Sequence, residues 1–251
     1  MTFLISVLKT IALVFWSLFA AVLTAPYLFT GGWKGVKKIS RVTMLWNRGI
    51  ARIINLRVKV YGDVPGGEGG LVVSNHMSYL DIIALGSVLP LRYSPKSEIS
   101  KWPFLGWYVG LSRPIWIDRA SNQSSKKALE DYTETIEHGM YPIVYPEGTT
   151  TDGKSGILPF KSTSFEAAIN GNVPVIPVLI GYKQPSNEPT VAWYGDMTLL
   201  PHVWQVLQFP SIAVELRFLS PIFHEGRSRK ELAAFTHAAL SREYSQTVSR
   251  S

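Results

Sequence analysis

The sequence predicts an α/β fold with a partly parallel central sheet flanked by helices, preceded by an N-terminal membrane-associated helical segment. Three observations lead to this prediction. The 251 residues are 46% apolar, which is enough for one sizeable core. The first 29 residues are almost wholly apolar. After Gly62, short apolar runs alternate with helical or turn segments, an order typical of a sheet covered by helices.

The N-terminal segment, Phe3 to Phe29, carries Lys9 as its only charge. At about 1.5 Å per residue, Ile11 to Phe29 approaches the thickness of a hydrocarbon layer of roughly 30 Å. Pro26 and the Gly31-Gly32 pair are expected to end or bend this segment. Two placements stay open. Either the segment crosses the bilayer and the cations that follow hold the rest of the chain in the cytoplasm, or it enters one leaflet and the chain returns to the same side.

The next segment, Trp33 to Leu56, is amphipathic on a helical wheel drawn at about 100° per residue. The cationic face holds Lys34, Lys37, Arg41, Arg48 and Arg52, and the opposite apolar face holds Ile39, Val42, Trp46, Ile50 and Ile53. Such a helix is expected to lie in the membrane interface, with its apolar face among acyl chains and its cations toward anionic head groups. The alternative is a helix that packs its apolar face into the protein core.

Positive charge is concentrated at the N-terminal end. Residues 1–62 contain nine lysines and arginines and no acid, whereas the remaining sequence carries 16 cations against 18 acids. Because a long apolar run adjoins the cations, a lipid surface is the expected partner and nucleic acid is not. The chain has no cysteine, which excludes disulfides, thiolate metal sites and a cysteine nucleophile.

The elements after Gly62 follow from apolar runs and from the turn residues between them. Strands are expected at Leu71–Ser74, Ile115–Ile117, Tyr141–Tyr145 and Val173–Ile180, with further strands at Thr190–Tyr194 and Ile212–Phe218. Helices are expected at Tyr79–Leu89, Ser124–His138, Phe165–Asn170 and Arg229–Tyr244. No repeat or linker interrupts this pattern. We therefore expect membrane-anchoring and interfacial helices at residues 1–58 and one domain, large enough to hold a catalytic site, at residues 59–251.

The heptad NHMSYLD, residues 75–81, places one of five histidines just after a predicted strand. Ligands of open α/β sheets gather at the carboxyl ends of strands, where His76 falls. An imidazole is suited to accept a proton near neutral pH, and a nearby carboxylate fixes its tautomer and stabilises the imidazolium. Asp81 is placed for this if a helix starts at Ser78. The pattern Ser78-x-x-Asp81 also fits a plain helix cap, and the heptad alone leaves both interpretations open.

Two further segments end predicted strands in polar residues. VYPEGTT, residues 144–150, presents Glu147 and two hydroxyls after a proline, and Gly148 permits a close backbone approach. WIDR, residues 116–119, ends in an arginine whose fork suits a phosphate. Taken singly, a strand-end turn and a surface ion pair explain these two segments.

Together and in this order, the three segments resemble the motifs of the glycerolipid acyltransferase family, of which 1-acylglycerol-3-phosphate acyltransferases are the best-known members. The first motif, Asn-His-x-x-x-x-Asp, is matched by His76 and Asp81. The second, Phe-Ile-Asp-Arg, is matched by residues 116–119 with tryptophan in place of phenylalanine. The third, Phe-Pro-Glu-Gly-Thr-Arg, is matched by residues 145–149, and residues 173–177 look like the fourth. The resemblance covers roughly residues 60 to 185.

The resemblance implies a membrane-bound lysolipid O-acyltransferase, with residues 59–251 as the acyltransferase domain. His76 would take the proton from the acceptor hydroxyl while Asp81 orients and charges the ring, so that the acceptor oxygen attacks a thioester without an acyl-enzyme. The acceptor-binding candidates are Arg119, Glu147, Gly148, Thr149, Thr150, Lys96 and Lys161. The implied co-substrate is acyl-CoA or acyl carrier protein, with no cofactor and no metal. The implied location is a membrane, with the domain on the cytoplasmic face and, in a bacterium, at the inner membrane.

Thr150 departs from the family pattern, in which an arginine is credited with contacting the acceptor phosphate. A hydroxyl brings no charge, and a hydrogen bond to a charged group is worth about 1.5–3 kcal/mol. Lys96, Arg119 or Lys161 would have to supply the charge instead. On the family's base rate, 1-acyl-sn-glycerol-3-phosphate, giving phosphatidic acid, ranks first as acceptor. Residues 147–161 look like the branch that includes lyso-ornithine lipid and other lysophospholipid acyltransferases, which is the alternative.

Two hypotheses from other classes make different predictions. A non-catalytic lipid-binding membrane protein that keeps the fold would bind lipid independently of His76 and consume no thioester. A metallohydrolase would need a second histidine at ligand spacing, and His138, His202, His224 and His237 form no pair four residues apart.

Overall fold

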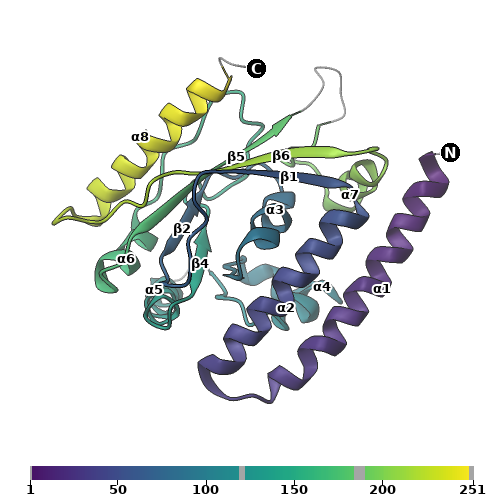
Figure 1. Cartoon of the computed structure of the whole chain (residues 1–251), viewed down its shortest axis with the longest axis horizontal. Helices are drawn as coiled ribbons and strands as arrows, with labels where there is room; N and C mark the ends of the chain where they lie inside the picture. The colour runs from purple at the N-terminus through teal and green to yellow at the C-terminus, as the bar shows by residue number, and fades with distance from the viewer. Residues whose placement is uncertain (1, 119–121, 184–189, 249–251) are drawn as a thin grey trace.

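The computed structural model describes residues 2–118, 122–183 and 190–248 (Figure 1). Within these residues, six strands form one sheet in the order β1-β6-β5-β2-β4-β3. The strands are β1 (Leu56–Tyr61), β2 (Leu71–Ser74), β3 (Leu91–Arg92), β4 (Tyr141–Val144), β5 (Val175–Lys183) and β6 (Ile212–Phe218). Strands β2, β3, β4 and β5 run parallel, whereas β6 is antiparallel to β5 and parallel to β1. The prediction of a partly parallel sheet is confirmed.

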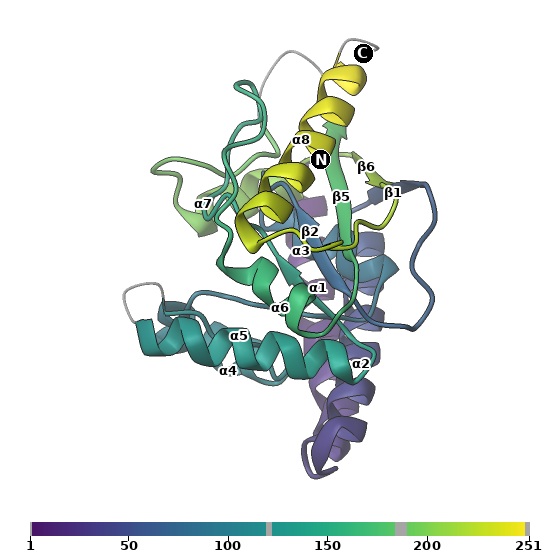
Figure 2. The same cartoon turned by 90° about the vertical axis from the view of Figure 1, so that its left-hand side faces the viewer.

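Helices cover both faces of the sheet (Figure 2). They are α1 (Thr2–Leu28), α2 (Gly32–Ile53), α3 (Leu80–Val88), α4 (Leu105–Gly110), α5 (Asn122–Glu137), α6 (Glu166–Asn170), α7 (Leu199–Leu207) and α8 (Arg229–Val248), with 3-10 turns η1 (Ser97–Lys101) and η2 (Thr163–Phe165). In β2, Val72 packs into a core cluster shared with α2, α3 and α7. Its neighbours Leu71 and Val73 pack into a second cluster shared with α5, α6 and α8. This alternation is what a strand buried on both faces requires.

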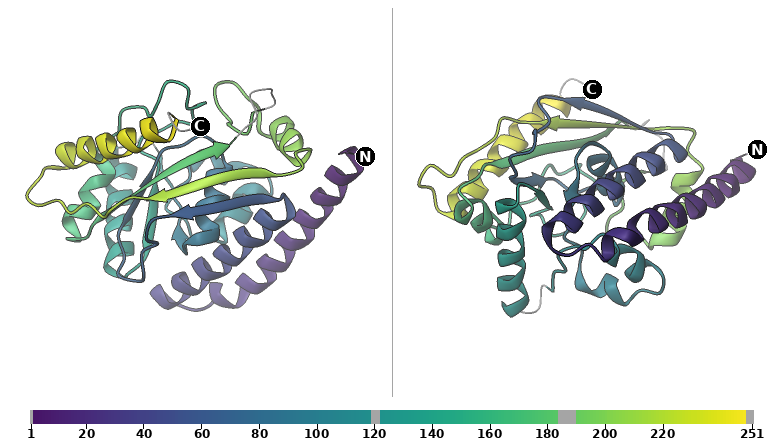
Figure 3. Two further views of the ribbon diagram at one scale, coloured as in Figure 1. Left: turned by 45° about the horizontal axis from the view of Figure 1, so that its top comes forward. Right: turned by 60° about the horizontal axis from the view of Figure 1, so that its bottom comes forward.

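Helix α1 lies along the domain, side by side with α2 (Figures 1 and 3). Near its start, Lys9 Nζ donates to the carbonyls of Leu207 (3.0 Å) and Phe209 (2.7 Å) beside the end of α7. At its end, Arg113 donates to the carbonyl of Leu28 at 2.6 Å. The opposite face is bare: Phe3, Leu4, Leu8, Phe15, Leu18 and Val22 are exposed. Among the described residues, α1 is the one helix long and apolar enough to cross a membrane.

Helix α2 corrects an expectation. Its apolar face does not meet acyl chains, because Ile39 is fully buried and Ile50 joins the core cluster shared with α3. The cationic face is exposed as expected, with Lys37, Arg41 and Arg48 open to solvent. The core-facing alternative is therefore the one observed. A helical wheel shows which face needs an apolar neighbour, but lipid and protein satisfy that need equally well.

Several smaller expectations also change. Pro26 lies inside α1 rather than ending it, and the helix ends at Leu28, just before the Gly31-Gly32 pair. The strand expected at Ile115–Ile117 is reduced to one parallel bridge between Ile117 and Lys96. No strand forms within the described part of Thr190–Tyr194. Helix α2 ends at Ile53 rather than Leu56, and strand β1 was not expected, although the alternation of apolar and charged residues in LRVKVY is a strand signal. The domain boundary expected between residues 58 and 59 falls within β1.

Candidate active site

The site lies where the carboxyl ends of the parallel strands β2, β4 and β5 meet. The loop after β2 is fixed first by Asn75, whose side chain is buried. Its Nδ2 donates to the Ile180 carbonyl (3.0 Å), and its Oδ1 accepts the Ile180 N–H (2.8 Å). The asparagine therefore extends the pairing between β2 and β5 by one step. It holds the following residue, His76, at a defined place on the sheet edge.

His76 and Asp81 form the pair that the spacing predicts. His76 Nδ1 and Asp81 Oδ2 are 2.7 Å apart. The carboxylate is fully buried, whereas the imidazole side chain is 19% exposed. A carboxylate only accepts, so the ring carries its proton on Nδ1 and keeps a lone pair on Nε2. No described residue hydrogen-bonds Nε2, which leaves that nitrogen available as a base.

Asp81 also acts as a cap, so the two interpretations of the heptad hold together. Its Oδ2 accepts the backbone N–H groups of Met77 (2.7 Å) and Ser78 (3.0 Å) just before α3 begins. Its Oδ1 accepts the Tyr182 hydroxyl at 2.6 Å. Burial and the nearby Asp81 charge raise the pKa of Tyr182 well above its ordinary value, so this hydroxyl stays protonated and donates. The carboxylate is held by four donors without any cation.

Tyr145, at the end of β4, stacks on the imidazole. The two ring centroids are 3.9 Å apart and the planes differ by 14°. This stacking restrains the ring about its side-chain axes and covers one of its faces. The Tyr145 hydroxyl is buried without a hydrogen-bond partner among the described residues. Burial and the Asp81 charge raise its pKa well above the ordinary value, so it adds no negative charge to the site.

Glu147 ties the turn after β4 to the histidine loop. Its Oε1 accepts the N–H of His76 (2.7 Å), and its Oε2 accepts the N–H of Leu158 (2.8 Å). The Thr151 N–H donates to the His76 carbonyl at 3.0 Å, which closes the same junction from the other side. Burial raises the pKa of Glu147, opposed by these two backbone donors. In this structure Glu147 positions the base, and its contact with an acceptor stays a prediction.

Most of the other acceptor-binding candidates lie at this turn, and Lys96 lies at the second motif. Gly148 has φ +79°, and a Cβ on it would come within 2.7 Å of Lys161 Nζ, so the exposed Lys161 lies directly against the turn. Thr149 is exposed and Thr150 partly buried. Lys96 is exposed beside Ile117, at the second motif. The candidate Arg119 lies outside the described residues. No contact made by these side chains tests their predicted role.

Three residues that hold the pair were not singled out from the sequence. Asn75 stands inside the quoted heptad, but its bond to β5 depends on which strand lies next to β2. Tyr145 was included only as the first residue of the third motif. Tyr182 had no signal, because a tyrosine in an apolar strand is most often a core residue.

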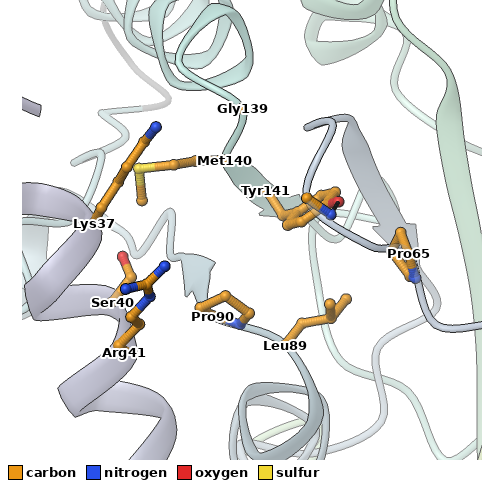
Figure 4. Close-up of a pocket in the computed structure, with 10 residues that line it drawn as sticks. Lys37, Ser40, Arg41, Pro65, Leu89, Pro90, Gly139, Met140 and Tyr141 are labelled. Atoms are coloured by element: carbon orange, nitrogen blue, oxygen red, sulfur yellow. Dashed lines mark hydrogen bonds between the residues drawn. The ribbon is translucent and has the colours of Figure 1, made fainter. Parts of the chain in front are cut away.

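A separate cavity of about 230 Å³ lies at the opposite, amino-terminal edge of the parallel strands (Figure 4). Lys37, Ser40 and Arg41 of α2 face Pro90 and Tyr141 across it. It contains no residue of the His76 site. Within residues 2–118, 122–183 and 190–248, no group of three His, Asp or Glu side chains is placed to hold a metal ion.

The geometry supports general-base catalysis on an acceptor hydroxyl. Proton uptake at Nε2 creates an imidazolium whose Nδ1–H already points at a buried carboxylate, so the developing charge is compensated without rearrangement. The described residues around His76 contribute no serine or other nucleophile hydrogen-bonded to it. The arrangement is therefore suited to a hydroxyl of a substrate rather than to a side chain of the protein itself.

Comparison with known proteins agrees with this chemistry. Residues 56–181 match the family described as Acyltransferase. Lyso-ornithine lipid O-acyltransferases are similar in sequence: that of Brucella abortus is 32% identical, covering 82% of each chain, and that of Pseudomonas aeruginosa is 32% identical, covering 80% of this chain and 77% of its own. A 1-acyl-sn-glycerol-3-phosphate acyltransferase of Neisseria meningitidis is 28% identical, covering 72% of this chain and 71% of its own.

The fold is also shared with a solved structure. The crystal structure of the 1-acyl-sn-glycerophosphate acyltransferase PlsC from Thermotoga maritima superposes with a TM-score of 0.68. It covers 98% of both chains at 22% identity, which speaks for the fold alone. The geometry above makes His76 and Asp81 the candidate catalytic pair, and the match over residues 56–181 gives the family. The chain belongs to the acyltransferase family, and it is an enzyme of the kind that acylates lysolipids.

Proposed function

We propose that this acyltransferase moves an acyl chain from acyl-CoA or acyl carrier protein to the free hydroxyl of a lyso-ornithine lipid in the membrane. The observation that carries the acyl-transfer step is the His76–Asp81 pair, with Nδ1 held at 2.7 Å from a buried carboxylate. Nε2 takes the proton of the acceptor hydroxyl, and the oxygen attacks the thioester carbonyl. The carbon–sulfur bond then breaks, and the leaving thiolate receives the proton from the imidazolium.

Thr150 supports lyso-ornithine lipid over lysophosphatidate. A phosphate monoester carries between one and two negative charges near neutral pH, with a second pKa of about 6. The ornithine head group instead offers one carboxylate and one ammonium. Lys161 lies beside Gly148, and Thr150 adds only a hydroxyl where the family has an arginine. A turn without that arginine suits a carboxylate better than a phosphate. The relatives at 32% identity bear the lyso-ornithine name, which favours the same acceptor.

The second candidate acceptor is 1-acyl-sn-glycerol-3-phosphate. Relatives at 28% identity act on it by name, and Lys161 also suits a phosphate. His76 and Asp81 have the same roles with either acceptor. The two acceptors differ in the head group, which lies at the turn around Thr150.

The location we propose is one leaflet, with the domain on the cytoplasmic face. Contacts from Lys9 to Leu28 bind α1 to the domain along nearly its whole length, so an α1 that crossed the bilayer would draw α7 into the hydrocarbon. The exposed cations of α2 suit the anionic cytoplasmic surface. In inside-out vesicles, tags at both ends of the chain are expected to be accessible together, and protection of the N-terminal tag alone would contradict this placement.

A panel of lysolipids tests the function. The purified enzyme is incubated in vesicles containing lyso-ornithine lipid, lysophosphatidate or lysophosphatidylethanolamine, with one radiolabelled acyl group carried on CoA or on acyl carrier protein. The expected result is fastest product formation with lyso-ornithine lipid. Product from lysophosphatidate alone would reject the acceptor and keep the reaction. Absence of product with every acceptor and both donors would reject the reaction and favour a non-catalytic lipid-binding protein.

The substitution Thr150→Arg tests the acceptor assignment inside one protein. A charged hydrogen bond to phosphate is worth about 1.5–3 kcal/mol, so the ratio of kcat/KM for lysophosphatidate over lyso-ornithine lipid should rise on the order of tenfold. Thr198→Arg, at an exposed threonine just before α7, is the matched control. An unchanged ratio for Thr150→Arg would show that this position does not face the acceptor head group.

A further inference from the structure

The chain makes a long excursion between two paired residues, Lys96 and Ile117. At its base, the Ser97 N–H donates to the Ile117 carbonyl (2.8 Å), and the Ile117 N–H donates to the Pro95 carbonyl (2.9 Å). Within this excursion, η1 is followed by a turn at residues 102–104 and then by α4. The excursion therefore starts and ends at the strand edge that carries Lys96 and the second motif.

The part of the excursion that points outward is aromatic. Phe104 is 89% exposed, Trp107 63% and Trp102 42%, and Leu105 is also exposed. We call these four side chains the aromatic tip. Single exposed apolar residues are common, but four within six positions, three of them large rings, form a contiguous patch that needs a partner.

The backbone of the tip is strained in a way that presents these rings. Phe104 has φ +60° and ψ −50°, and the Leu105 N–H donates to the Pro103 carbonyl at 2.6 Å. This is a γ-turn of the rare strained hand, centred on a residue with a bulky side chain. The turn is also closely packed, because a Cβ on Gly106 would lie 2.3 Å from the Ser100 carbonyl oxygen. The exposed Phe104 ring buries little surface against the protein that would offset this strain. Strain of this kind is a reason to look for a function.

The helix that carries part of the aromatic tip packs against α1 and α2. The Tyr108 hydroxyl, in α4, donates to the Ser17 carbonyl in the middle of α1 (3.2 Å). The same tyrosine ring packs on Trp46 of α2, with centroids 5.5 Å apart. In Figure 1, α4 accordingly lies beside the α1–α2 pair. The exposed residues Lys96 and Lys101 flank the tip, where they would meet lipid head groups, with Glu98 the acid between them.

We propose that the aromatic tip is a second membrane-docking element, inserted into the same leaflet as the bare face of α1. Its partner is the lipid surface itself: acyl chains for the rings and anionic head groups for the flanking lysines. Tryptophan at this depth matches its preference for the boundary between head groups and hydrocarbon. Together with the proposed function, this docking seats the edge that carries Lys96 at the level of the acceptor head group. The docking itself does not depend on acyl transfer.

The absence of native cysteine allows a direct depth measurement. Phe104→Cys is labelled with an environment-sensitive fluorophore and bound to vesicles of phosphatidylethanolamine and phosphatidylglycerol, with or without spin-labelled acyl chains as quenchers. Lys230→Cys, exposed on α8 at the other side of the molecule, is the matched control (Figure 1). The expected result is a blue shift and quenching at position 104 and neither at position 230. Water-like emission at position 104 in vesicle-bound protein, or failure of the protein to bind vesicles, would overturn the proposal.

A second variant separates docking from folding. Phe104→Gly removes the ring and relieves the positive φ, so the melting temperature should hold or rise while vesicle affinity falls about tenfold. Phe223→Gly, at an exposed phenylalanine before α8, is the control and should leave affinity unchanged. Unaltered affinity of Phe104→Gly would contradict docking. Acyl transfer should fall for an acceptor in vesicles but not for a short-chain acceptor dissolved in water. If Phe104→Gly loses activity with both acceptors, a docking role is contradicted. If the wild-type protein acylates neither acceptor, the proposed function is rejected instead.

Discussion

Asp81→Asn separates the two roles of this residue, because it keeps the shape of the side chain and removes its charge. In the structure Oδ2 accepts three donors, from His76 Nδ1 and the backbone N–H groups of Met77 and Ser78. An amide oxygen can replace Oδ2 toward all three. The imidazolium formed during catalysis then faces a neutral partner. The Tyr182 hydroxyl faces the amide NH2 group, which does not accept its proton.

The expected magnitude follows from the geometry. The charge centres of the imidazolium ring and the carboxylate lie about 4 Å apart when their nearest atoms are in hydrogen-bond contact. Two unit charges at this separation interact by about 4 kcal/mol at an effective dielectric constant of about 20. Losing this in the transition state corresponds to a fall in kcat of about 10³-fold. Turning two charged backbone hydrogen bonds into neutral ones costs about 1 kcal/mol each. The melting temperature should then fall by about 4–8 °C for a chain of this size.

The assay compares turnover of one radiolabelled acyl donor with the melting temperature of the same preparations. Asp63→Asn, at an exposed aspartate after β1 on the opposite edge of the sheet, is the matched control and should change neither quantity. A variant at position 81 that melts lower but keeps turnover within about threefold of wild type would refute the reasoning, because Asp81 would then be only a helix cap. Lost turnover with an unchanged melting temperature would refute the capping half instead.

Three further substitutions test the surrounding groups. His76→Ala should lower kcat by about 10² or more as the general base is lost, with little change in melting temperature because the ring is partly exposed; near-normal turnover would reject its role. Tyr182→Phe removes a donor from Asp81 and costs about 1–3 kcal/mol of stability. The carboxylate then stabilises the imidazolium more strongly, so the acid limb of the pH–rate profile should move to higher pH, and a lower melting temperature with an unmoved limb would mean a merely structural residue. Glu147→Gln should reduce both stability and turnover, since an amide can accept only one of the two backbone N–H groups that the carboxylate now binds. Burial raises the pKa of Glu147, so the folded state holds that proton more tightly than the unfolded chain. Its stabilising contribution is then fully present below the ordinary glutamate pKa and is lost as pH rises through the raised value. The melting-temperature advantage of wild type over Glu147→Gln should therefore shrink as pH rises, and an advantage that grows would contradict this pKa direction.

The contact between His76 and Asp81 was predictable because it is local. Five residues separate His76 from Asp81, and a strand, a short loop and the first turn of a helix are enough to bring them together. Strands and helices after Gly62 were likewise predictable from short-range patterns, and β6 has the predicted bounds Ile212–Phe218. The predictions of a short strand at Ile115–Ile117 and of a strand at Thr190–Tyr194 were wrong, because apolar runs of three to five residues do not specify a pairing partner.

The support of the pair was not predictable. Tyr182 lies 101 residues from Asp81, and Glu147 lies 71 residues from His76. Both contacts exist because β2 lies between β5 and β4, with all three carboxyl ends at one edge. Strand order depends on which apolar faces are buried together across the whole chain, and no single window of sequence contains that information.

The sequence by itself determined the elements, the charge separation and the base with its carboxylate, because periodicity and spacing act over a few residues. The tertiary structure decided what each apolar face meets. It buried Ile39 and Ile50 of α2 inside the protein, left one face of α1 bare, and set the aromatic tip beside α1. The physical reason is that apolar surface leaves water as readily for protein as for lipid, so only the packing of the folded chain shows which surface remains for the membrane.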